Sequence, residues 1–593
     1  MAAFRRRRQG QGLLPRWALV AVLAAVPLAA PPFWVTLANY IGLYSIVALG
    51  LVLLTGVAGQ TSFGQAAFVG IGAYTTAVLA TQFQWSPWAN LVVGLVLTTV
   101  LALFLGFITL RMKGHFLPLA TIAWGMSLYY VFGNSEVLGG HTGITGIPGL
   151  AVFGWPITSE RVFCVLIWAV TIAALFAADN LLDSRPGRAL RALKGQLAMA
   201  EAFGVDAARQ KTIVFVGAAL LACVSGWLYA HLQRFVNPTP FGINQGIEYL
   251  FMAVVGGAGS VWGAVVGATI LTLAKQVLQD ALPSLLGRAG NFEVVVFGML
   301  VIVLLHRSRD GVWPWLARAL PRRAARPIPD AAPLPPRPRP AVGGPLLDVR
   351  AVRKTFGGLV AVDDLSFVVR PREIVGLIGP NGAGKSTTFG LIAGELQPSS
   401  GDVLFCGRTL VGSLPHEVAG RGIARTFQHV KLVPTMSVQD NVALGAYGRG
   451  RAGFVRAALR LDRAEEAQTL AEAVRALERT GLAANAHDPA GSLPLGRQRI
   501  VEIARALAAD PVLLLLDEPA AGLRLREKEA LAALLRQLRA DGMTLLLVEH
   551  DMEFVMGLTD RLVVMDFGEK LAEGVPAEIQ RDPRVQEAYL GGV

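Results

Sequence analysis

Cysteine is scarce in this sequence, because a chain of 593 residues contains only Cys164, Cys223 and Cys406, which lie far apart. Three scattered thiols argue against a disulfide framework and against a cysteine-based metal site. Charge is also scarce, at 16% of residues, and is almost missing from the long apolar runs before residue 307. The first half of the chain is therefore not an ordinary soluble domain.

The rest of the composition divides the chain into two parts. Before residue 307, apolar runs are interrupted by Gly and Pro, whereas after residue 345 charged and apolar residues mix as in soluble α/β proteins. We predict a transmembrane domain at residues 1–306, a linker at 307–345 and a soluble domain at 346–593. The predicted fold class is a polytopic α-helical membrane domain followed by an α/β domain with a phosphate-binding loop.

That loop is the motif GPNGAGKST, from Gly379 to Thr387. Glu373 to Ile378 reads as a buried strand that leads into it, and a helix should begin near Lys385. Backbone N–H groups would surround the phosphates, Lys385 would neutralise their charge and Ser386 would ligate Mg²⁺. We therefore expect ATP and Mg²⁺ as cofactors. The predicted nucleotide-binding residues of the loop are Gly379, Pro380, Asn381, Gly382, Ala383, Gly384, Lys385, Ser386 and Thr387.

Two further strands carry candidate catalytic residues at their ends. LLLLDEP, from Leu513 to Pro519, ends in two carboxylates: Asp517 would hold Mg²⁺ and Glu518 would polarise the attacking water. The strand from Thr544 to Val548 is followed by Glu549 and His550, and His550 can reach the γ-phosphate from that position.

Arginine-rich stretches explain the net charge of +12. They lie at Arg5 to Arg8, at 185–211 and at 307–339, and each flanks hydrophobic sequence. A basic excess can indicate nucleic-acid binding, but this placement favours cytoplasmic topology signals, and we expect no nucleic-acid partner.

Apolar runs approach the ~20 residues that a membrane-crossing helix needs. Residues 1–31 also fit a cleaved signal peptide, but another apolar run follows at once and favours a retained first span. The predicted spans are Trp17 to Ala30, Trp34 to Thr55, Phe63 to Phe83, Trp88 to Leu110, Phe116 to Phe132, Val162 to Ala178 and Thr212 to Leu232, with two or three more between Ile247 and Leu305.

The loop at 133–160 contains no Lys or Arg, whereas the loops after the fourth and sixth spans are basic. The amino terminus is thus predicted inside, and the ATP-binding domain must be inside too, so the number of spans is even. GGAGSVWG, from Gly256 to Gly263, interrupts an apolar run. Two short crossings there would give ten spans in total, and a re-entrant segment would give eight; ten is favoured.

Two other segments allow two interpretations each. In GVAGQTSFGQAAFVGIGAY the small residues favour close helix packing, but Gln60, Thr61, Ser62 and Gln65 could also face a substrate pathway. The stretch 307–340 has eight Arg against two Asp and includes PLPPRPRP; it is predicted to be an extended tether, and a spacer is favoured over a ligand for a proline-recognition domain.

The soluble half resembles an ATP-binding cassette (ABC) domain over residues 346–593, on the loop and the strand ends described above. The resemblance implies that Phe356 stacks on adenine, that Gln428 in RTFQ contacts Mg²⁺ and senses the γ-phosphate, and that His550 is the switch histidine. It also implies that a signature segment caps the partner subunit's ATP; that segment is Leu493, Pro494, Leu495, Gly496, Arg497 and Gln498. Pro494 replaces the usual serine, and Arg524 stands where Asp or Asn is normal.

The membrane half resembles the permeases of branched-chain amino acid importers. The matching segments are GQTSFGQAAFVGIGAY, RMKGHFLPLATIAWG, GGHTGITGIPG and the stretch from SRPGRALRALKG to AEAFGV. LPxG signatures resembling the one here occur in the ATPases of the same importers. By this resemblance Glu201, Ala202 and Gly204 belong to a coupling loop that docks on the ATPase; a solvated amphipathic helix is the alternative.

These resemblances imply a fusion of two subunits that are usually separate, a permease and an ATPase. They imply ATP-driven import of branched-chain or related amino acids across the bacterial cytoplasmic (inner) membrane, within membrane lipid. The expected partners are a second permease subunit, a second ABC ATPase and an extracytoplasmic substrate-binding protein that delivers the small-molecule substrate. The alternatives are import of urea, short amides or aromatic acids, an exporter half-transporter, and a nucleotide-gated channel.

Overall fold

The computed structural model describes residues 29–109, 116–152, 154–286, 310–319, 331–340 and 343–590, with a few positions between 298 and 307. The chain divides into two compact units, each of which is drawn from separate stretches of sequence. The helical unit comprises residues 1–182 and 208–326, and the sheet unit comprises residues 183–207 and 327–593. The loop at 183–207 thus groups with the soluble part of the chain.

Long apolar helices form the helical unit. Of the helices in the described ranges, five are long and apolar enough to cross a membrane, judged by length and composition. They are α3 with the π-helical turn η1 (Pro32–Leu51 and Val52–Val57), α5 (Pro87–Thr109), α6 (Phe116–Asn134), α7 (Glu160–Leu182) and α10 (Ala207–Gln233). Shorter or more polar helices are α4 (Gln65–Thr81), α11 (Ile243–Gly257), α12 (Gly263–Leu286) and α14 (Trp313–Ala319).

Six predicted spans coincide with described helices, from Trp34–Thr55 in α3 and η1 to Thr212–Leu232 in α10. The predicted span Trp17 to Ala30 lies almost wholly outside the described residues, and so does much of the run that ends at Leu305. GGAGSVWG does separate two helices, α11 and α12, which pack against each other and against α3. The choice between eight and ten spans stays a prediction.

Small residues allow the helices of this unit to approach closely. A Cβ atom on Gly72 of α4 would lie 2.2 Å from the backbone oxygen of Cys223 in α10, and one on Gly226 would lie 1.9 Å from the oxygen of Val69. Both separations are far below van der Waals contact. The packing interpretation of the glycine-rich segment therefore holds for Gly72.

Short strands lie in two of the loops that connect the apolar helices, between α6 and α7 and between α10 and α11. β1 (Ile144–Thr145) pairs with β4 (Phe235–Val236), and β2 (Ala151–Val152) pairs with β3 (Trp155–Pro156), all antiparallel. Three of these four strands lie in the loop without Lys or Arg.

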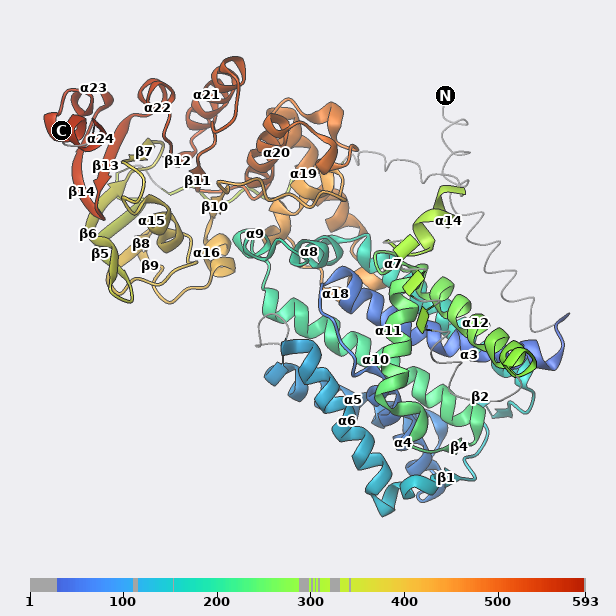
Figure 1. The fold of residues 1–593 in the computed structure, drawn as a ribbon. Coiled ribbons are helices and arrows are strands. Elements are labelled where there is room, and N and C mark those ends of the chain that lie inside the picture. The colour runs from blue at the N-terminus through green and yellow to red at the C-terminus, as the bar shows by residue number, and fades with distance from the viewer. Residues whose placement is uncertain are drawn as a thin grey trace. The chain divides into compact units, whose positions relative to one another are not determined.

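Two sheets build the sheet unit (Figure 1). The larger has the order β10-β11-β12-β7-β13-β14, and its strands are parallel except for the edge strand β14. Its bounds are Ile423–Arg425, Leu513–Asp517, Thr544–Val548, Ile374–Ile378, Arg561–Asp566 and Glu569–Gly574, in that order. The smaller sheet is antiparallel: β6 (Leu359–Val369), β5 (Leu347–Phe356), β8 (Ser400–Phe405) and β9 (Arg408–Thr409).

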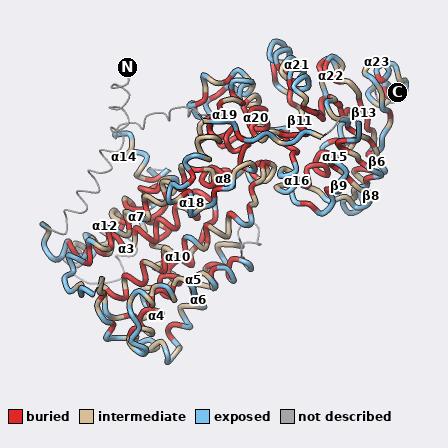
Figure 2. Tube along the Cα trace, turned by 180° about the vertical axis from the view of Figure 1, so that it is seen from behind, coloured by how far each residue is buried: buried red, intermediate tan, exposed pale blue. Residues whose placement is uncertain are grey.

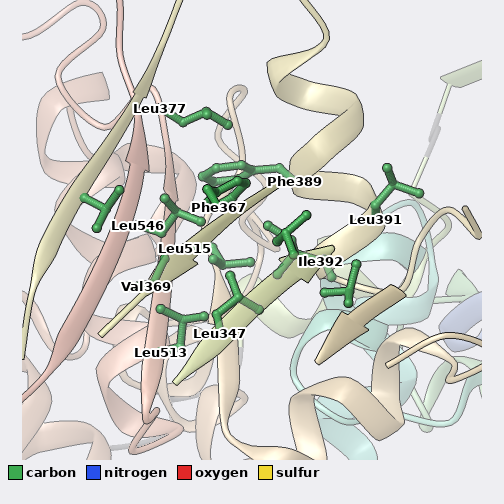
Figure 3. Packing of buried hydrophobic residues seen from close by; sticks show 14 of the residues in the cluster. Leu347, Phe367, Val369, Leu377, Phe389, Leu391, Ile392, Leu513, Leu515 and Leu546 are labelled. Atoms are coloured by element: carbon green, nitrogen blue, oxygen red, sulfur yellow. The ribbon is translucent and has the colours of Figure 1, made fainter. Parts of the chain in front are cut away.

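The core of this unit lies between the two sheets and helix α15 (Lys385–Ile392). Figure 3 shows Phe389 of α15 beside Phe367 of β6, with Leu515 of β11 close by. Every residue of β7, β11 and β12 is buried, as expected for parallel strands covered on both faces, and Figure 2 shows β11 among the buried segments. Rigid central strands therefore carry the residues at their carboxyl ends.

Helices cover the sheets and extend the unit. They are α8 (Arg185–Leu193), α9 (Leu197–Ala202), α16 (Pro415–Arg421), α17 (Val438–Ala443), α18 (Phe454–Ala458), α19 (Arg463–Arg479), α20 (Leu495–Ala508), α21 (Leu525–Ala540), α22 (Met552–Leu558), α23 (Pro576–Ile579) and α24 (Pro583–Leu590).

The predicted linker at 307–345 is not an extended tether throughout, because residues 313–319 form helix α14, in which Trp313 stacks on Trp262. Residues 331–340 contain no helix or strand, and they lie against the sheet unit. The backbone N–H of Arg337 donates to Asp510 at 2.6 Å, and the Arg339 guanidinium donates to the other oxygen of that carboxylate at 2.7 Å. Leu334 is buried, and its carbonyl accepts a hydrogen bond from Arg449. This stretch is an attached strap and not a free spacer.

Candidate functional site

The phosphate-binding loop joins the central strand β7 to α15. Its glycines are required by conformation and by space: φ is 152° at Gly379 and 95° at Gly384, in the region that disfavours side chains. A Cβ on Gly379 would lie 2.1 Å from the Met565 carbonyl oxygen, and one on Gly384 would lie 2.3 Å from that of Ala361. The loop is therefore wrapped tightly around the amino terminus of α15, where backbone N–H groups and the helix dipole favour an anion.

Lys385 begins α15 and its side chain turns back into the loop. Its ammonium group donates to the carbonyl oxygens of Gly379 and Pro380, both at 2.7 Å. Burial lowers the pKa of Lys385, and the nearby Glu518 carboxylate opposes that shift. A buried cation at the start of α15 suits a polyphosphate, because a phosphate would pair with the charge that burial disfavours.

Asp517 ends β11 and is buried beside an arginine that the sequence analysis did not single out. Arg425 of β10 donates to the Asp517 carboxylate at 3.0 Å and to Glu395 at 2.7 Å. Burial raises the pKa of Asp517, and Arg425 opposes the shift. Arg425 is the first residue of the RTFQ motif, so its position beside Gln428 was the available signal.

Glu518, Gln428 and His550 converge on one oxygen atom. The Gln428 amide donates to Glu518 Oε1 at 3.0 Å, and His550 Nε2 lies 3.0 Å from the same oxygen. These residues come from three separate segments of the chain. The structure thus brings together the three residues that were predicted to be catalytic.

The backbone at Glu518 has φ = 47°, which is strained for a residue with a long side chain. Its N–H donates to the carbonyl of Val548 in the neighbouring strand, at 2.9 Å. Buried Glu549 accepts hydrogen bonds from the backbone N–H groups of Ala520 and His550, at 2.6 and 3.1 Å. The sequence places Glu549 at a strand end but indicates no role for it. In the structure its carboxylate joins the loop after β11 to the loop after β12.

These residues fit Mg²⁺ and ATP. Mg²⁺ in nucleotide sites is commonly held by one or two carboxylates, a hydroxyl and the phosphates themselves. Asp517 at the end of β11 and Ser386 in the first turn of α15 would supply the protein ligands. In the described part of the chain no group of three or more His, Cys, Asp or Glu side chains could hold a metal alone. Bound Mg²⁺ would supply charge neutralisation of the phosphates. Glu518 and His550 would then orient and deprotonate water at the γ-phosphate.

The signature segment forms the start of α20, which runs from Leu495 to Ala508. Pro494 is the N-cap residue and provides no side-chain hydrogen bond, where a serine could cap the helix. Arg499, three residues after Gly496, donates to the backbone carbonyl of Gln428 at 3.0 Å. The signature helix is thereby joined to the glutamine that contacts Glu518.

Two other predicted residues lie at exposed positions. The Phe356 ring ends β5 and is 46% exposed, as a surface for a stacked base requires. Arg524 is the exposed N-cap of α21, and its backbone N–H donates to Glu527 at 2.9 Å. Their roles toward adenine and toward a partner's ATP site stay predictions.

The segment 183–207 lies against the sheet unit and is not a solvated helix. The Arg188 guanidinium, 1% exposed, binds both carboxylate oxygens of Glu466, at 2.5 and 2.8 Å. Phe203, next to the predicted coupling residues Glu201, Ala202 and Gly204, is buried and lies 4.9 Å from the Arg505 guanidinium. The segment is thus held by a charged pair on α8 and an aromatic contact after α9.

Gly204 of the segment 183–207 lies beside Gly448 of the ATPase. It has φ = 87°, and a Cβ there would lie 3.4 Å from the Cα of Gly448. Helix α9 packs against α16, as Figure 1 shows. Arg185 adds a second basic contact, 4.2 Å from the ring of Tyr447.

Comparisons with known proteins match both parts of the chain. Residues 33–305 match the family described as "Branched-chain amino acid transport system / permease component". Residues 362–521 match "ABC transporter", and residues 569–593 match "Branched-chain amino acid ATP-binding cassette transporter". The high-affinity branched-chain amino acid transport ATP-binding protein LivG of Salmonella typhimurium strain LT2 is 42% identical over 250 residues, which cover 42% of this chain and 98% of LivG. The chain belongs to the branched-chain amino acid ABC transporter family.

Other ATP-binding proteins are also similar to part of this chain. The ATP-binding protein BraF of Pseudomonas aeruginosa PAO1 is 38% identical over 250 residues, 42% of this chain and 98% of BraF. A crystal structure of a nucleotide-free ATP-binding cassette from an ABC transporter is 31% identical and covers 42% of this chain and 100% of that chain, with a TM-score of 0.38. The family matches at 33–305 and 362–521 show that this ABC transporter chain carries a membrane permease and an ABC ATPase in one polypeptide.

Arg524→Asp tests the departure from the usual pattern at the start of α21. We expect the substitution to change ATP hydrolysis only when a partner cassette is present, because Arg524 is exposed and lies outside the phosphate loop. The measurement is phosphate release by the chain alone and in its assembled complex. An equal change in both preparations would mean that Arg524 acts within its own ATP site.

Proposed function

We propose that this chain imports branched-chain or related amino acids across the bacterial cytoplasmic membrane, driven by ATP hydrolysis. The observation that carries the proposal is the docking of 183–207, a loop between two helices of the permease region, on the ABC ATPase of the same chain. The names of LivG and BraF, which describe branched-chain amino acid transport, support the substrate class.

The working complex contains two permeases and two ATPases. This chain supplies one of each, a second permease subunit and a second ABC ATPase supply the others, and an extracytoplasmic binding protein delivers the substrate. ATP binding closes the two cassettes, and the residues at Leu493 to Gln498 contact the partner's nucleotide. Hydrolysis at Glu518 then allows the cassettes to separate.

The docked segment is the mechanical connection in this proposal. Arg188 and Phe203 hold α8 and α9 on the sheet unit, so that movement of the cassette moves the ends of α7 and α10, which flank the segment in sequence. The pathway between the permeases is thereby exposed to each side of the membrane in turn. Gly204, which follows Glu201 and Ala202, lies beside Gly448 of the ATPase at this connection.

In the proposed orientation the amino terminus, the segment 183–207 and the ABC ATPase are cytoplasmic. The loop at 133–160, which contains no Lys or Arg, is extracytoplasmic. An exporter half-transporter would have six spans with long cytoplasmic helical extensions. That class is disfavoured because the sequence of this chain predicts eight or ten spans joined by short loops.

Uptake by the assembled complex tests the substrate class. Proteoliposomes with ATP and Mg²⁺ inside and the binding protein outside should take up labelled L-leucine, and unlabelled isoleucine and valine should compete. Urea, acetamide and benzoate should not compete. Uptake of one of these compounds without uptake of leucine would move the chain to another importer class.

A further inference from the structure

Four polar side chains meet in the helical unit. Tyr40 and Tyr44 of α3, Glu248 of α11 and Lys275 of α12 line a cavity of about 140 Å³. Tyr44 lies near the middle of the apolar helix formed by Pro32–Val57, against which α11 and α12 pack. The cluster is therefore halfway along a predicted membrane span.

Glu248 and Lys275 form an ion pair there. The Lys275 ammonium donates to Glu248 at 2.9 Å, and the side chains of Lys275 and Glu248 are 40% and 24% exposed, respectively. Ionisable groups at membrane depth are costly when they face lipid, and they usually mark a water-filled pathway or a binding site. A pair that only joined two helices could be replaced by apolar side chains with little loss of stability. Stabilisation of the helix packing therefore does not explain why two charged side chains lie at this depth.

The rings of Tyr40 and Tyr44 line the cavity together with Glu248, and Tyr249, which is outside the lining, contacts Tyr44. The ring of Tyr44 lies 5.8 Å from that of Tyr40 and 5.6 Å from that of Tyr249, measured between centroids. Aromatic faces beside a carboxylate attract an ammonium group. Lys275, on the next helix, offers three N–H donors to a carboxylate.

We propose that this cavity binds a zwitterionic α-amino acid as it crosses the permease, which rests on the import function proposed above. The ligand enters by exchanging partners: its ammonium group pairs with Glu248, and its carboxylate pairs with Lys275. Every charge keeps a partner, so no uncompensated charge is created in a medium of low dielectric constant. An acid without an ammonium group, or an amine without a carboxylate, leaves one charge unpaired.

The rest of the lining combines apolar and polar groups, and Gln276 and Gln279 contribute amides. Leu37, Met252 and Leu271 contribute apolar groups to the cavity, and Thr272 contributes a hydroxyl group that has no hydrogen-bond partner among the described residues. The volume lies below the ~300–1,000 Å³ of sites for drug-sized ligands, as a single small amino acid requires. The site thus favours small zwitterions over urea, amides and aromatic acids.

Uptake of L-leucine in the proteoliposomes tests the charged pair. Glu248→Gln and Lys275→Gln should each lower uptake about tenfold or more, because one charge loses its partner. Asp280→Asn, the same carboxylate-to-amide change on α12 but outside the cavity lining, is the matched control and should keep wild-type uptake. Wild-type uptake in Glu248→Gln would overturn the assignment.

The exchanged pair, Glu248→Lys with Lys275→Glu, separates binding from helix joining. It restores an ion pair but reverses the direction in which a zwitterion must lie, so uptake should stay about tenfold low while the amount of folded protein recovers. If the pair only joins α11 and α12, the exchange restores uptake too, and the inference fails.

Thiol labelling tests the cavity without disturbing the charged pair. Thr272→Cys is made in a Cys406→Ser background, since Cys164 and Cys223 are buried and Cys406 is exposed. L-leucine should slow the reaction of the introduced thiol with a water-soluble methanethiosulfonate, whereas 4-methylpentanoate and 3-methylbutylamine should not. Equal protection by 4-methylpentanoate, no protection by leucine, or no labelling at all would overturn the site.

The two proposals fail differently. If the wild-type complex accumulates leucine but leucine does not protect the thiol of the Thr272→Cys variant, the site is wrong and the import function stands. If the wild-type complex transports urea or benzoate and no amino acid, the import function itself is wrong.

Discussion

Replacing Glu518 with glutamine is expected to lower ATP hydrolysis about a hundredfold or more while ATP binding is kept. The amide has the same shape and can still accept a hydrogen bond from Gln428, but it cannot take a proton from water. Gln428 and His550 both lie 3.0 Å from the carboxylate oxygen that is affected.

Phosphate release and binding of a fluorescent ATP analogue measure the two effects separately. Glu553→Gln is the matched control, because it makes the same change at an exposed position of α22. Full hydrolysis in Glu518→Gln would remove Glu518 from its catalytic role. Loss of ATP binding would mean that the carboxylate holds the loop in shape.

Arg188→Ala is expected to abolish uptake while the ABC ATPase still hydrolyses ATP. Arg188 and Glu466 have side chains that are only 2% and 13% exposed, so removing one partner leaves a buried charge and costs about 3–5 kcal/mol. Burial alone would lower the pKa of Arg188, but Glu466 and Asp440 raise it, and the guanidinium stays charged. The docked segment 183–207 should therefore detach from the cassette.

Leucine uptake and phosphate release by the same proteoliposomes measure the uncoupling. Lys194→Ala, at an exposed position just after α8, should keep both activities. The reversed pair, Arg188→Glu with Glu466→Arg, should recover part of the uptake. Normal uptake in Arg188→Ala would show that this contact does not transmit the movement of the cassette.

The local features of the ATP site could be predicted from the sequence. The strand expected at Glu373 to Ile378 is observed as β7, the helix expected near Lys385 begins there, and the strand expected at Thr544 to Val548 is β12. Each strand is marked by an apolar run of strand length that ends in glycines or charged residues, and the helix is marked by the glycine-rich loop before it. Such signals lie within a few neighbouring residues.

The side-chain pairings could not be predicted in the same way. Arg425 meets Asp517 across 92 residues, and Arg188 meets Glu466 across 278. Each pair depends on how the strands and helices pack, and neither partner has a neighbouring residue that indicates the other. The pair Glu248 and Lys275 is closer in sequence, but only the packing of α11 on α12 brings the two charges together.

The strap at 331–340 shows that amino-acid composition does not predict where a segment binds. Its prolines and arginines predict a segment that cannot form its own core, and residues 331–340 contain no helix or strand, but the composition does not reveal a binding surface. Asp510 and Arg449, which hold the strap, lie more than a hundred residues away in the chain. A sequence that cannot form its own core can still pack on the core of another domain.

Accumulation of leucine against its gradient tests the central claim that this chain couples its own ATP hydrolysis to import. Proteoliposomes containing the wild-type complex, with ATP and Mg²⁺ inside and the binding protein outside, should raise internal leucine above the external concentration. Vesicles without ATP, or with Glu518→Gln, should not. If leucine instead equilibrates across the membrane without hydrolysis, the chain is a gated channel and the account is wrong.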